Sequence, residues 1–485
     1  MSPAAGGRNA RGARRPLVAA AIALLAPLAG FILVARSSYE PSRQYRHVPD
    51  SGPVSVALEA GASLTSPGNP VLSRFSIFEC RPAGPHDGPY SLAFVEFDDQ
   101  GFLWDPRQMT TLEEHITTIG AGRGVIMVVF VHGWNHSANP ADNNVACFQQ
   151  VVQAVSLLEH AVTRDNPRAV VGVFCGWRGS VYRSPSINKM LTFWDRLSAS
   201  NRVGERGDML RVLSMLSHLK HTLPGSHPNI LAITGHSMGA RALFEAVGAN
   251  LKESLARASL GESMIGGFGD LVVLVNPAFV AAEYRLIDEI AREPGIQAAA
   301  NAEPSLVLIS SEADQVMRRL YPIGEYIRPF GQSANPSRDR QMLFQTAANY
   351  APFVTHRLRV VEGAIPNPSS GGKTSPCGCR FVCAEELPIV RGVLDHPEQR
   401  ELFRYSDIRV LSPSHSGGDS LIYRLALENL REHRLPAIVI QADGPILPEH
   451  GESYTPALIE FLVRLVNTKV SSVPARADRS ASASP

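Results

Sequence analysis

Hydrophobic positions along this chain fall into short unbroken runs, and segments with helical spacing separate one run from the next. A continuous apolar run of this kind is typical of a parallel strand that is buried on both faces of a sheet. The runs that predict such strands lie at residues 125–131, 169–175, 230–234, 271–275, 306–309 and 437–440. A strand-like segment at 91–97, a turn at 98–101 and a return at 102–104 predict an antiparallel hairpin at the N-terminal edge of the sheet.

The segments between these runs place apolar residues at helical spacing. The predicted helices lie near residues 108–119, 144–163, 209–216, 281–292 and 456–466. Thr455 is suited to cap the last helix, with Pro456 in its first turn. Alternating strands and helices predict the α/β class, with a mostly parallel sheet and helices on both of its faces.

One strand-to-helix junction carries a serine between two glycines. An apolar run leads into Gly235-His236-Ser237-Met238-Gly239, and a helical segment follows. In so tight a turn, a side chain at either flanking position would collide with the turn, so glycine is needed at both. The turn should expose the Ser237 hydroxyl at the carboxyl end of the sheet. Ser237 is therefore a candidate nucleophile.

Two stretches do not fit a minimal sheet of this type. They are residues 176–207, with Trp177, Tyr182, Phe193 and Trp194, and residues 326–435. Both leave the carboxyl ends of strands, so we expect a cap or pocket walls, with surface decoration as the alternative. The predicted segments are a membrane anchor or signal at 1–36, a linker and irregular region at 37–84, a core at 85–325, an insertion at 326–435, the last strand and helix of the core at 436–469, and a disordered tail at 470–485.

Composition narrows the class of protein. The 485 residues are 44% hydrophobic and 19% charged, which is typical of a folded globular chain. Lysine and arginine total 46, aspartate and glutamate total 45, and the formal net charge is +1. Because this balance leaves no basic field for a phosphate backbone, nucleic acid is excluded as a partner.

The N-terminal segment has the pattern of a membrane anchor. An uncharged apolar stretch runs from Leu17 to Ala35, after arginines at positions 8, 11, 14 and 15. Its length exceeds that of a signal-peptide core and matches a membrane-spanning helix. Arginines at 36, 43 and 46 weaken the charge asymmetry that sets orientation. We expect a retained anchor with the folded part outside the cytoplasm, at the cell envelope; a cleaved export signal is the alternative.

Three of the six cysteines are crowded together, at Cys377, Cys379 and Cys383. A zinc site is weakly indicated, because no C-x-x-C partner lies downstream. The spacing favours a disulfide within the cluster, or from the cluster to Cys80.

The order of these parts resembles the α/β-hydrolase superfamily, and within it the serine esterases and lipases. The resemblance rests on Phe130-Val131-His132-Gly133-Trp134 after an early strand, on the serine turn, and on a late histidine. The resemblance covers residues 92–466 except the insertion at 326–435. The segments 195–199 and 321–324 also look like those of a poorly characterised bacterial branch of the superfamily. The resemblance implies an oxyanion hole formed by the N–H groups of Met238 and Trp134. It makes His132 a residue that orients this loop, not a base.

A carboxylate should follow the serine at the carboxyl end of a later strand, because the order in this superfamily is Ser, Asp, His. Asp314 follows the run at 306–309 and is the candidate, with a helix N-cap as its alternative role. Glu283 and Asp288 are second choices. Asp270 is excluded, because it opens its strand at the opposite edge of the sheet.

Among the later histidines, His450 alone lies between the last predicted strand and the last predicted helix. That loop carries the base in such folds, so His450 is the candidate, with His415 second and His356 third. The sequence thus predicts a carboxylic ester hydrolase acting through Ser237, His450 and Asp314 on a small-molecule or lipid ester. It needs no metal or organic cofactor. An acyltransferase and a catalytically silent binding domain are the alternatives, and the oligomeric state is left open.

Overall fold

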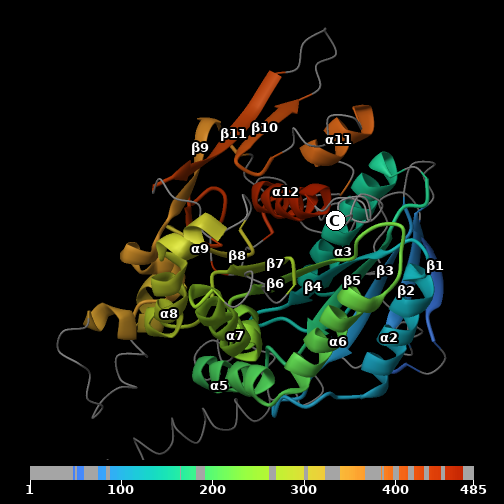
Figure 1. Ribbon diagram of the computed structural model, residues 1–485, viewed down its shortest axis with the longest axis horizontal. Helices are drawn as coiled ribbons and strands as arrows, with labels where there is room; N and C mark the ends of the chain where they lie inside the picture. Colours follow the sequence, from blue (N-terminus) through green and yellow to red (C-terminus); the bar gives the residue numbers. More distant parts are fainter. Residues whose placement is uncertain are drawn as a thin grey trace, which may run out of the picture.

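The computed structural model (Figure 1) describes most of the residues between the predicted linker and the C-terminal tail. The described residues are 47–49, 52–58, 75–82, 88–163, 165–181, 192–261, 269–299, 304–322, 339–365, 384, 387–396, 404–412, 420–430, 436–448, 450 and 454–472.

The described residues form one 12-stranded sheet, in the order β1-β2-β3-β5-β4-β6-β7-β8-β12-β9-β11-β10. Its strands are β1 Val54–Leu58, β2 Ile77–Pro82, β3 Tyr90–Glu96, β4 Val125–Val131, β5 Ala169–Gly176, β6 Ile230–His236, β7 Leu271–Val275, β8 Leu306–Ser311, β9 His356–Gly363, β10 Asp407–Ser412, β11 Ser420–Asn429 and β12 Ala437–Ala442. The central strands from β3 to β12 run parallel to their neighbours. The predicted α/β class is therefore confirmed.

Helices cover both faces of this sheet (Figure 1). They are α2 Arg107–Gly120, α3 Asn143–Val162, α5 Phe193–Glu205, α6 Asp208–Thr222, α7 Met238–Ser259, α8 Ala281–Ala291, α9 Pro294–Ala299, α11 Pro388–Asp395 and α12 Pro456–Ser472, with short turns η3 Val316–Leu320, η4 Arg340–Leu343, η5 Ala347–Asn349 and η6 Ala351–Phe353. Alternate residues of β4 enter two separate cores, because side chains alternate across a strand. Met127 and Val129 pack with α2, α6 and α7, whereas Val128 and Phe130 pack with α3 and α12.

The antiparallel part of the N-terminal edge differs in detail from the predicted hairpin. β3 lies inside the sheet, between an antiparallel β2 and a parallel β5. The expected return at 102–104 is reduced to a single antiparallel bridge between Phe97 and Leu103. β1 and β2 also fall in the stretch 37–84, which was expected to be irregular. β1 pairs with β2 and β2 pairs with β3, so each of these short strands is held by the next strand along the chain.

The described part of the stretch 326–435 extends the sheet. β9 pairs in parallel with β12, and β11 and β10 continue from it with antiparallel pairing. Three of its strands therefore belong to the same sheet as the serine turn. Helix α11 packs against the core formed with α3 and α12.

The cysteines do not follow the expected pairing with Cys80. Cys80 and Cys175 are buried free thiols, and burial raises the pKa of each to about 12. Cys147 is in a disulfide whose partner lies outside the described residues. The cluster at Cys377, Cys379 and Cys383 also lies outside them.

Within the described part of the chain, no helix combines the length and the apolar character that a membrane span requires. The predicted anchor at 1–36 and the tail from 473 onward lie outside that part.

Candidate active site

Ser237 occupies a strained turn between β6 and α7. Its backbone has φ 56° and ψ −120°, a conformation that residues other than glycine rarely adopt. The N–H of Ser237 donates to the Val275 carbonyl at 2.8 Å, and its carbonyl accepts from the N–H of Arg241 at 3.1 Å. Bonds to β7 on one side and to α7 on the other therefore hold the turn in place.

The two glycines of the turn are closely surrounded, Gly239 by backbone atoms and Gly235 by a side chain and the backbone of Ala240. A Cβ at Gly239 would lie 2.3 Å from the Val131 carbonyl oxygen and 2.4 Å from that of His132. A Cβ at Gly235 would lie 2.7 Å from a methyl carbon of Leu243. Glycine is therefore required most strictly at Gly239, where the close contact is with the backbone at the end of β4.

The structure brings Ser237, His450 and Asp314 together. The Ser237 Oγ lies 2.6 Å from His450 Nε2, and His450 Nδ1 lies 2.6 Å from Asp314 Oδ2. The Asp314 side chain is fully buried and that of His450 is 11% exposed. An ionised carboxylate can only accept, so Nδ1 carries the proton and Nε2 is left to accept from the serine.

Asp314 is not the N-cap of the turn that follows it, because that position belongs to Gln315, but it does bind the backbone of this turn. Its second oxygen, Oδ1, accepts from the N–H of Met317 at 3.0 Å, at the start of η3. One carboxylate oxygen therefore holds the local backbone while the other faces His450.

The Ser237 side chain is only 1% exposed, although the sequence predicted an exposed hydroxyl. A Cβ added to Gly133 would lie 3.1 Å from the Ser237 Cβ, so the loop after β4 lies close against the serine. His450, in the segment between β12 and α12, contacts the Ser237 hydroxyl, so the two segments together cover the serine.

The second-choice residues have other partners. Glu283 lies 3.4 Å from Arg241, and Asp288 pairs with Arg292. His356 begins β9 and its Nδ1 lies 2.9 Å from the Thr355 hydroxyl. His415 lies outside the described residues.

Asp270 opens β7, as expected. Its carboxylate accepts from the N–H of Leu231 at 2.8 Å and pairs with Lys220 at 2.9 Å. It therefore lies at the amino end of the strands, away from Ser237.

His132 is fixed as a neutral ring in the loop after β4. Its Nε2 accepts from the backbone N–H of Trp177 at 3.0 Å, so Nδ1 donates to the Gly133 carbonyl at 2.9 Å. The His132 imidazole stacks on the Trp177 indole, with ring centroids 5.7 Å apart. Complete burial lowers the pKa of His132 to about 4. These contacts agree with a role in orienting the loop, and they show a part for Trp177 that the sequence did not suggest.

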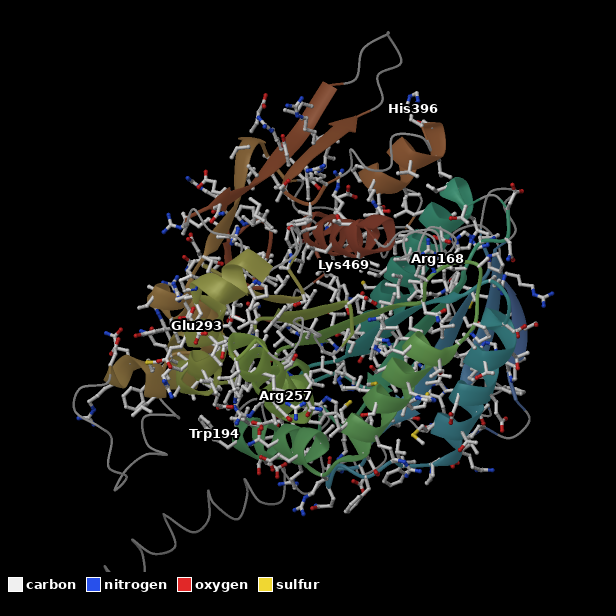
Figure 2. The ribbon with its side chains drawn as sticks, viewed as in Figure 1. Arg168, Trp194, Arg257, Glu293, His396 and Lys469 are labelled. Atoms are coloured by element: carbon white, nitrogen blue, oxygen red, sulfur yellow. The ribbon has the colours of Figure 1, made fainter. Side chains whose placement is uncertain are left out.

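The two predicted oxyanion donors come from the start of α7 and from the loop after β4. Met238 is the first residue of α7, where backbone N–H groups lack partners within the helix. Trp134 follows Gly133, and its indole N–H donates to the Thr192 hydroxyl at 3.2 Å. The indole also packs edge-on against Phe193, whereas Trp194 points outward and is 47% exposed (Figure 2).

Asn276 is a further supporting residue that the sequence analysis missed. It has φ 45°, its N–H donates to the Ile309 carbonyl at 2.7 Å, and its Oδ1 accepts from the N–H of Ser311 at 3.1 Å. These bonds join the end of β7, which holds the serine turn, to the end of β8, which leads to Asp314. A lone asparagine directly after a buried strand is the only local signal.

An apolar cavity of about 40 Å³ lies under the turn, between the sheet and helices α3 and α12. It is bordered by the small side chains of Ala232 and Thr234 on β6 and reaches His236 and Tyr454. Among the described residues, neither ring nitrogen of His236 nor the hydroxyl of Tyr454 has a hydrogen-bond partner. Burial lowers the pKa of His236, so its ring is neutral beside His450, with ring centroids 5.4 Å apart.

No protein-family model and no curated protein matches the sequence. Among solved structures, the chain is weakly similar to the phospholipase PlaB from Legionella pneumophila in complex with thio-NAD, with 10% identity and a TM-score of 0.25 over 73% of this chain and 60% of that chain. A second PlaB structure gives 11% identity and a TM-score of 0.24 over 61% and 67% of the two chains. The Tle1 effector bound to the VgrG spike of the Type 6 secretion system has 10% sequence identity and a TM-score of 0.18, over 76% of this chain and 77% of that chain. Similarity at these TM-scores does not establish a common fold.

The low pKa of His132 makes stability depend on pH. Between its folded pKa of about 4 and an unfolded pKa of about 6.5, the unfolded chain binds more protons. Stability should therefore be full above pH ~6.5 and fall toward pH ~4, by up to about 1.4 kcal/mol per pH unit. Denaturant unfolding of wild type and His132→Gln over this range should show the steeper loss in wild type. If the free energy of unfolding depended on pH in the same way in both proteins, the low pKa of His132 would be contradicted.

Proposed function

We propose that this chain is a serine hydrolase of carboxylic esters, built on the plan of the α/β-hydrolase superfamily. The observation that carries the proposal is the hydrogen-bonded series Ser237–His450–Asp314, with both links at 2.6 Å. The three residues follow β6, β12 and β8, so they meet at the carboxyl ends of parallel strands. A nucleophile, a base and a carboxylate that orients the base are the groups that ester hydrolysis by serine requires.

In the first half of the reaction, the Ser237 Oγ attacks the ester carbonyl carbon and its proton passes to His450 Nε2. Asp314 stabilises the imidazolium that forms. The N–H groups of Met238 and Trp134 meet the oxyanion, an effect worth about 2.7–4 kcal/mol per donor. The bond to the alcohol oxygen then breaks, and His450 returns the proton to the leaving alcohol.

In the second half, water attacks the acyl-enzyme while His450 takes its proton. The acid leaves when Ser237 regains that proton, so the net reaction is ester and water to acid and alcohol. An alcohol in place of water would make the same site an acyltransferase. We retain that reaction as the alternative, with small-molecule or lipid esters as the substrate class for both.

We also propose that residues 1–36 tether the chain to a membrane with the folded part outside the cytoplasm. The support is the apolar stretch Leu17–Ala35 behind its arginines.

Ser237→Ala should abolish turnover and covalent labelling by a fluorophosphonate, because both need the hydroxyl. The fold should persist, since only one small atom is lost, and this can be checked by circular dichroism. A wild-type protein that folds but resists labelling would instead favour the silent binding domain.

His450→Ala should lower kcat by roughly 10⁶-fold, nearly as much as loss of the serine, because triad members act as a unit. Asp314→Asn should cost roughly 10⁴-fold by allowing the wrong imidazole tautomer. His356→Ala is the matched control and should retain activity. If His356 proved essential and His450 dispensable, the assignment of the base would be wrong.

Deletion of residues 1–36 should release the protein from the membrane fraction and leave its activity on water-soluble esters unchanged. Fractionation and an ester assay on the same preparation test both points. A truncated protein that misfolds would place this segment in the core.

A further inference from the structure

The loop that carries Trp134 rests on another loop. We call residues 132–136 the oxyanion loop and residues 176–179 the supporting loop. Trp177 donates its backbone N–H to His132 Nε2 at 3.0 Å and its indole N–H to the His132 carbonyl at 2.8 Å. The N–H of Asn135 donates to the Gly179 carbonyl at 2.9 Å. Trp134 lies between these attachments, so its position depends on that of the supporting loop.

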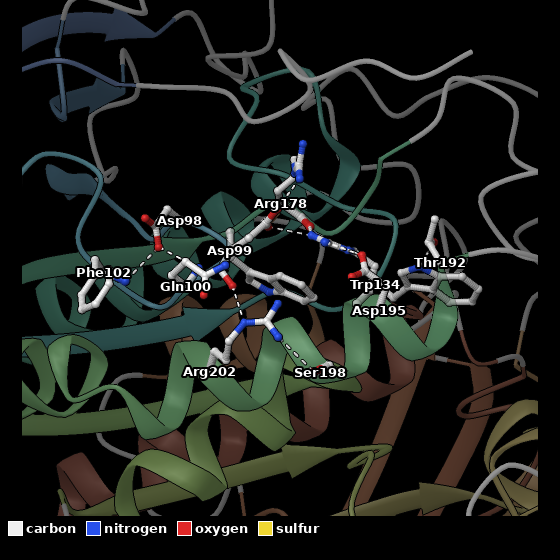
Figure 3. A network of polar contacts seen from close by, with 12 residues as sticks. Asp98, Asp99, Gln100, Phe102, Trp134, Arg178, Thr192, Asp195, Ser198 and Arg202 are labelled. Atoms are coloured by element: carbon white, nitrogen blue, oxygen red, sulfur yellow. Dashed lines mark hydrogen bonds and ion pairs between the residues drawn. The ribbon is translucent and has the colours of Figure 1, made fainter. Parts of the chain in front are cut away.

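Two arginines, Arg178 in the supporting loop and Arg196 on α5, bind the loop to Asp99 in the turn after β3 (Figure 3). The Arg178 side chain pairs with Asp99, in the turn after β3. The Arg196 guanidinium donates from Nη1 to Asp99 Oδ1 at 2.7 Å and to the Arg178 carbonyl at 2.9 Å. The carboxylate of Asp99 thus holds the Arg178 side chain directly and its backbone through Arg196.

Helix α5 holds the same assembly at two further points. The N–H of Arg202 Nε donates to the Asp99 carbonyl at 2.8 Å, and the helix approaches the turn so closely that a Cβ on Gly101 would lie 2.1 Å from the Arg202 carbonyl oxygen. At the other end of α5, Thr192 accepts from the Trp134 indole. One helix therefore connects the turn at Asp99 with the residue that presents the oxyanion donor.

The Asp99 carboxylate is ionised in this setting. Burial by itself raises its pKa, but the hydrogen bonds and charges of Arg196 and Arg178 outweigh burial and lower the pKa overall. The Arg196 side chain is only 3% exposed. Arg196 also pairs with Asp195, so loss of the Asp99 carboxylate would remove the link from Arg196 to the turn without leaving the guanidinium unpaired.

We propose that Asp99 is a positioning residue for the oxyanion hole: through Arg178 and Arg196 it sets the supporting loop, and through that loop the N–H of Trp134. The proposal rests on the proposed function, because it concerns the same site. It also gives the described part of the stretch 176–207 a role in supporting the catalytic loop.

The test compares an ester with its thionoester, in which sulfur replaces the carbonyl oxygen. Sulfur is a weak hydrogen-bond acceptor, so a thionoester gains little from the oxyanion donors. Asp99→Asn should lower kcat on the ester by about tenfold, less than the 10²–10³-fold cost of losing a donor outright. KM and the thionoester rate should change little. Equal losses on both substrates, or no loss, would overturn the proposal.

Asp208→Asn is the matched control. Asp208 accepts from the N–H of Leu103 at 2.7 Å and so anchors the same turn, but through a different carboxylate. The ratio of its kcat on the ester to its kcat on the thionoester should equal that of wild type, even where its melting temperature falls as far as that of Asp99→Asn. A matching fall in the ratio would mean that general loosening of the turn is responsible.

If Asp99→Asn does not fold, Arg178→Lys replaces it. This change keeps the charge but loses the forked guanidinium geometry, and it should lower the ratio in the same direction. An unchanged ratio would overturn the proposal. Ser237→Ala separates this proposal from the proposed function. If Ser237→Ala retains full activity, the proposed function fails. If Ser237→Ala is inactive but the ester-to-thionoester rate ratio is unchanged in the variants at residues 99 and 178, only the positioning role is refuted.

Discussion

The close contact between the first turn of α7 and the end of β4 is the constraint on which the site depends. Gly239 lies so near the Val131 and His132 carbonyls that no other residue fits there without movement of the backbone. This contact places the serine turn directly beside the oxyanion loop, whose Gly133 lies against Ser237. The positive φ of Ser237 is sustained by bonds from β7 and α7, so the strain is held by the surrounding sheet.

Residues from distant parts of the chain reach this turn because parallel strands end at the same edge of a sheet. Asp314 follows β8 and His450 follows β12, which are adjacent strands. Ser237 follows β6, with β7 between it and β8. Asn276 bridges that gap by hydrogen bonds to β8, which link the strand end beside Ser237 to the strand that leads to Asp314. The relative placement of Ser237, Asp314 and His450 is therefore a property of the sheet more than of any single loop.

The two stretches that interrupt the simple alternation of strand and helix contribute in different ways. In the first, α5 binds the turn at Asp99 and the Trp134 indole, so its described residues support the oxyanion loop. In the second, β9, β11 and β10 lengthen the sheet beyond β12. Long-range polar or backbone contacts join both stretches to the edge of the sheet that carries Ser237, so each is part of the same folded unit.

The sequence by itself determined the central strands and the position of the serine, because continuous apolar runs and flanking glycines are local signals. The run at 125–131 has the bounds of β4, and Gly235 and Gly239 bracket the turn as expected. Chain order was enough to choose Asp314 and His450 for the positions that now lie 2.6 Å from one another. The free state of Cys80, the pairing of β9 with β12 and the link from Asp99 to Arg178 depend on which distant segments meet. Such contacts leave no periodic pattern in the sequence, so only the tertiary structure decided them.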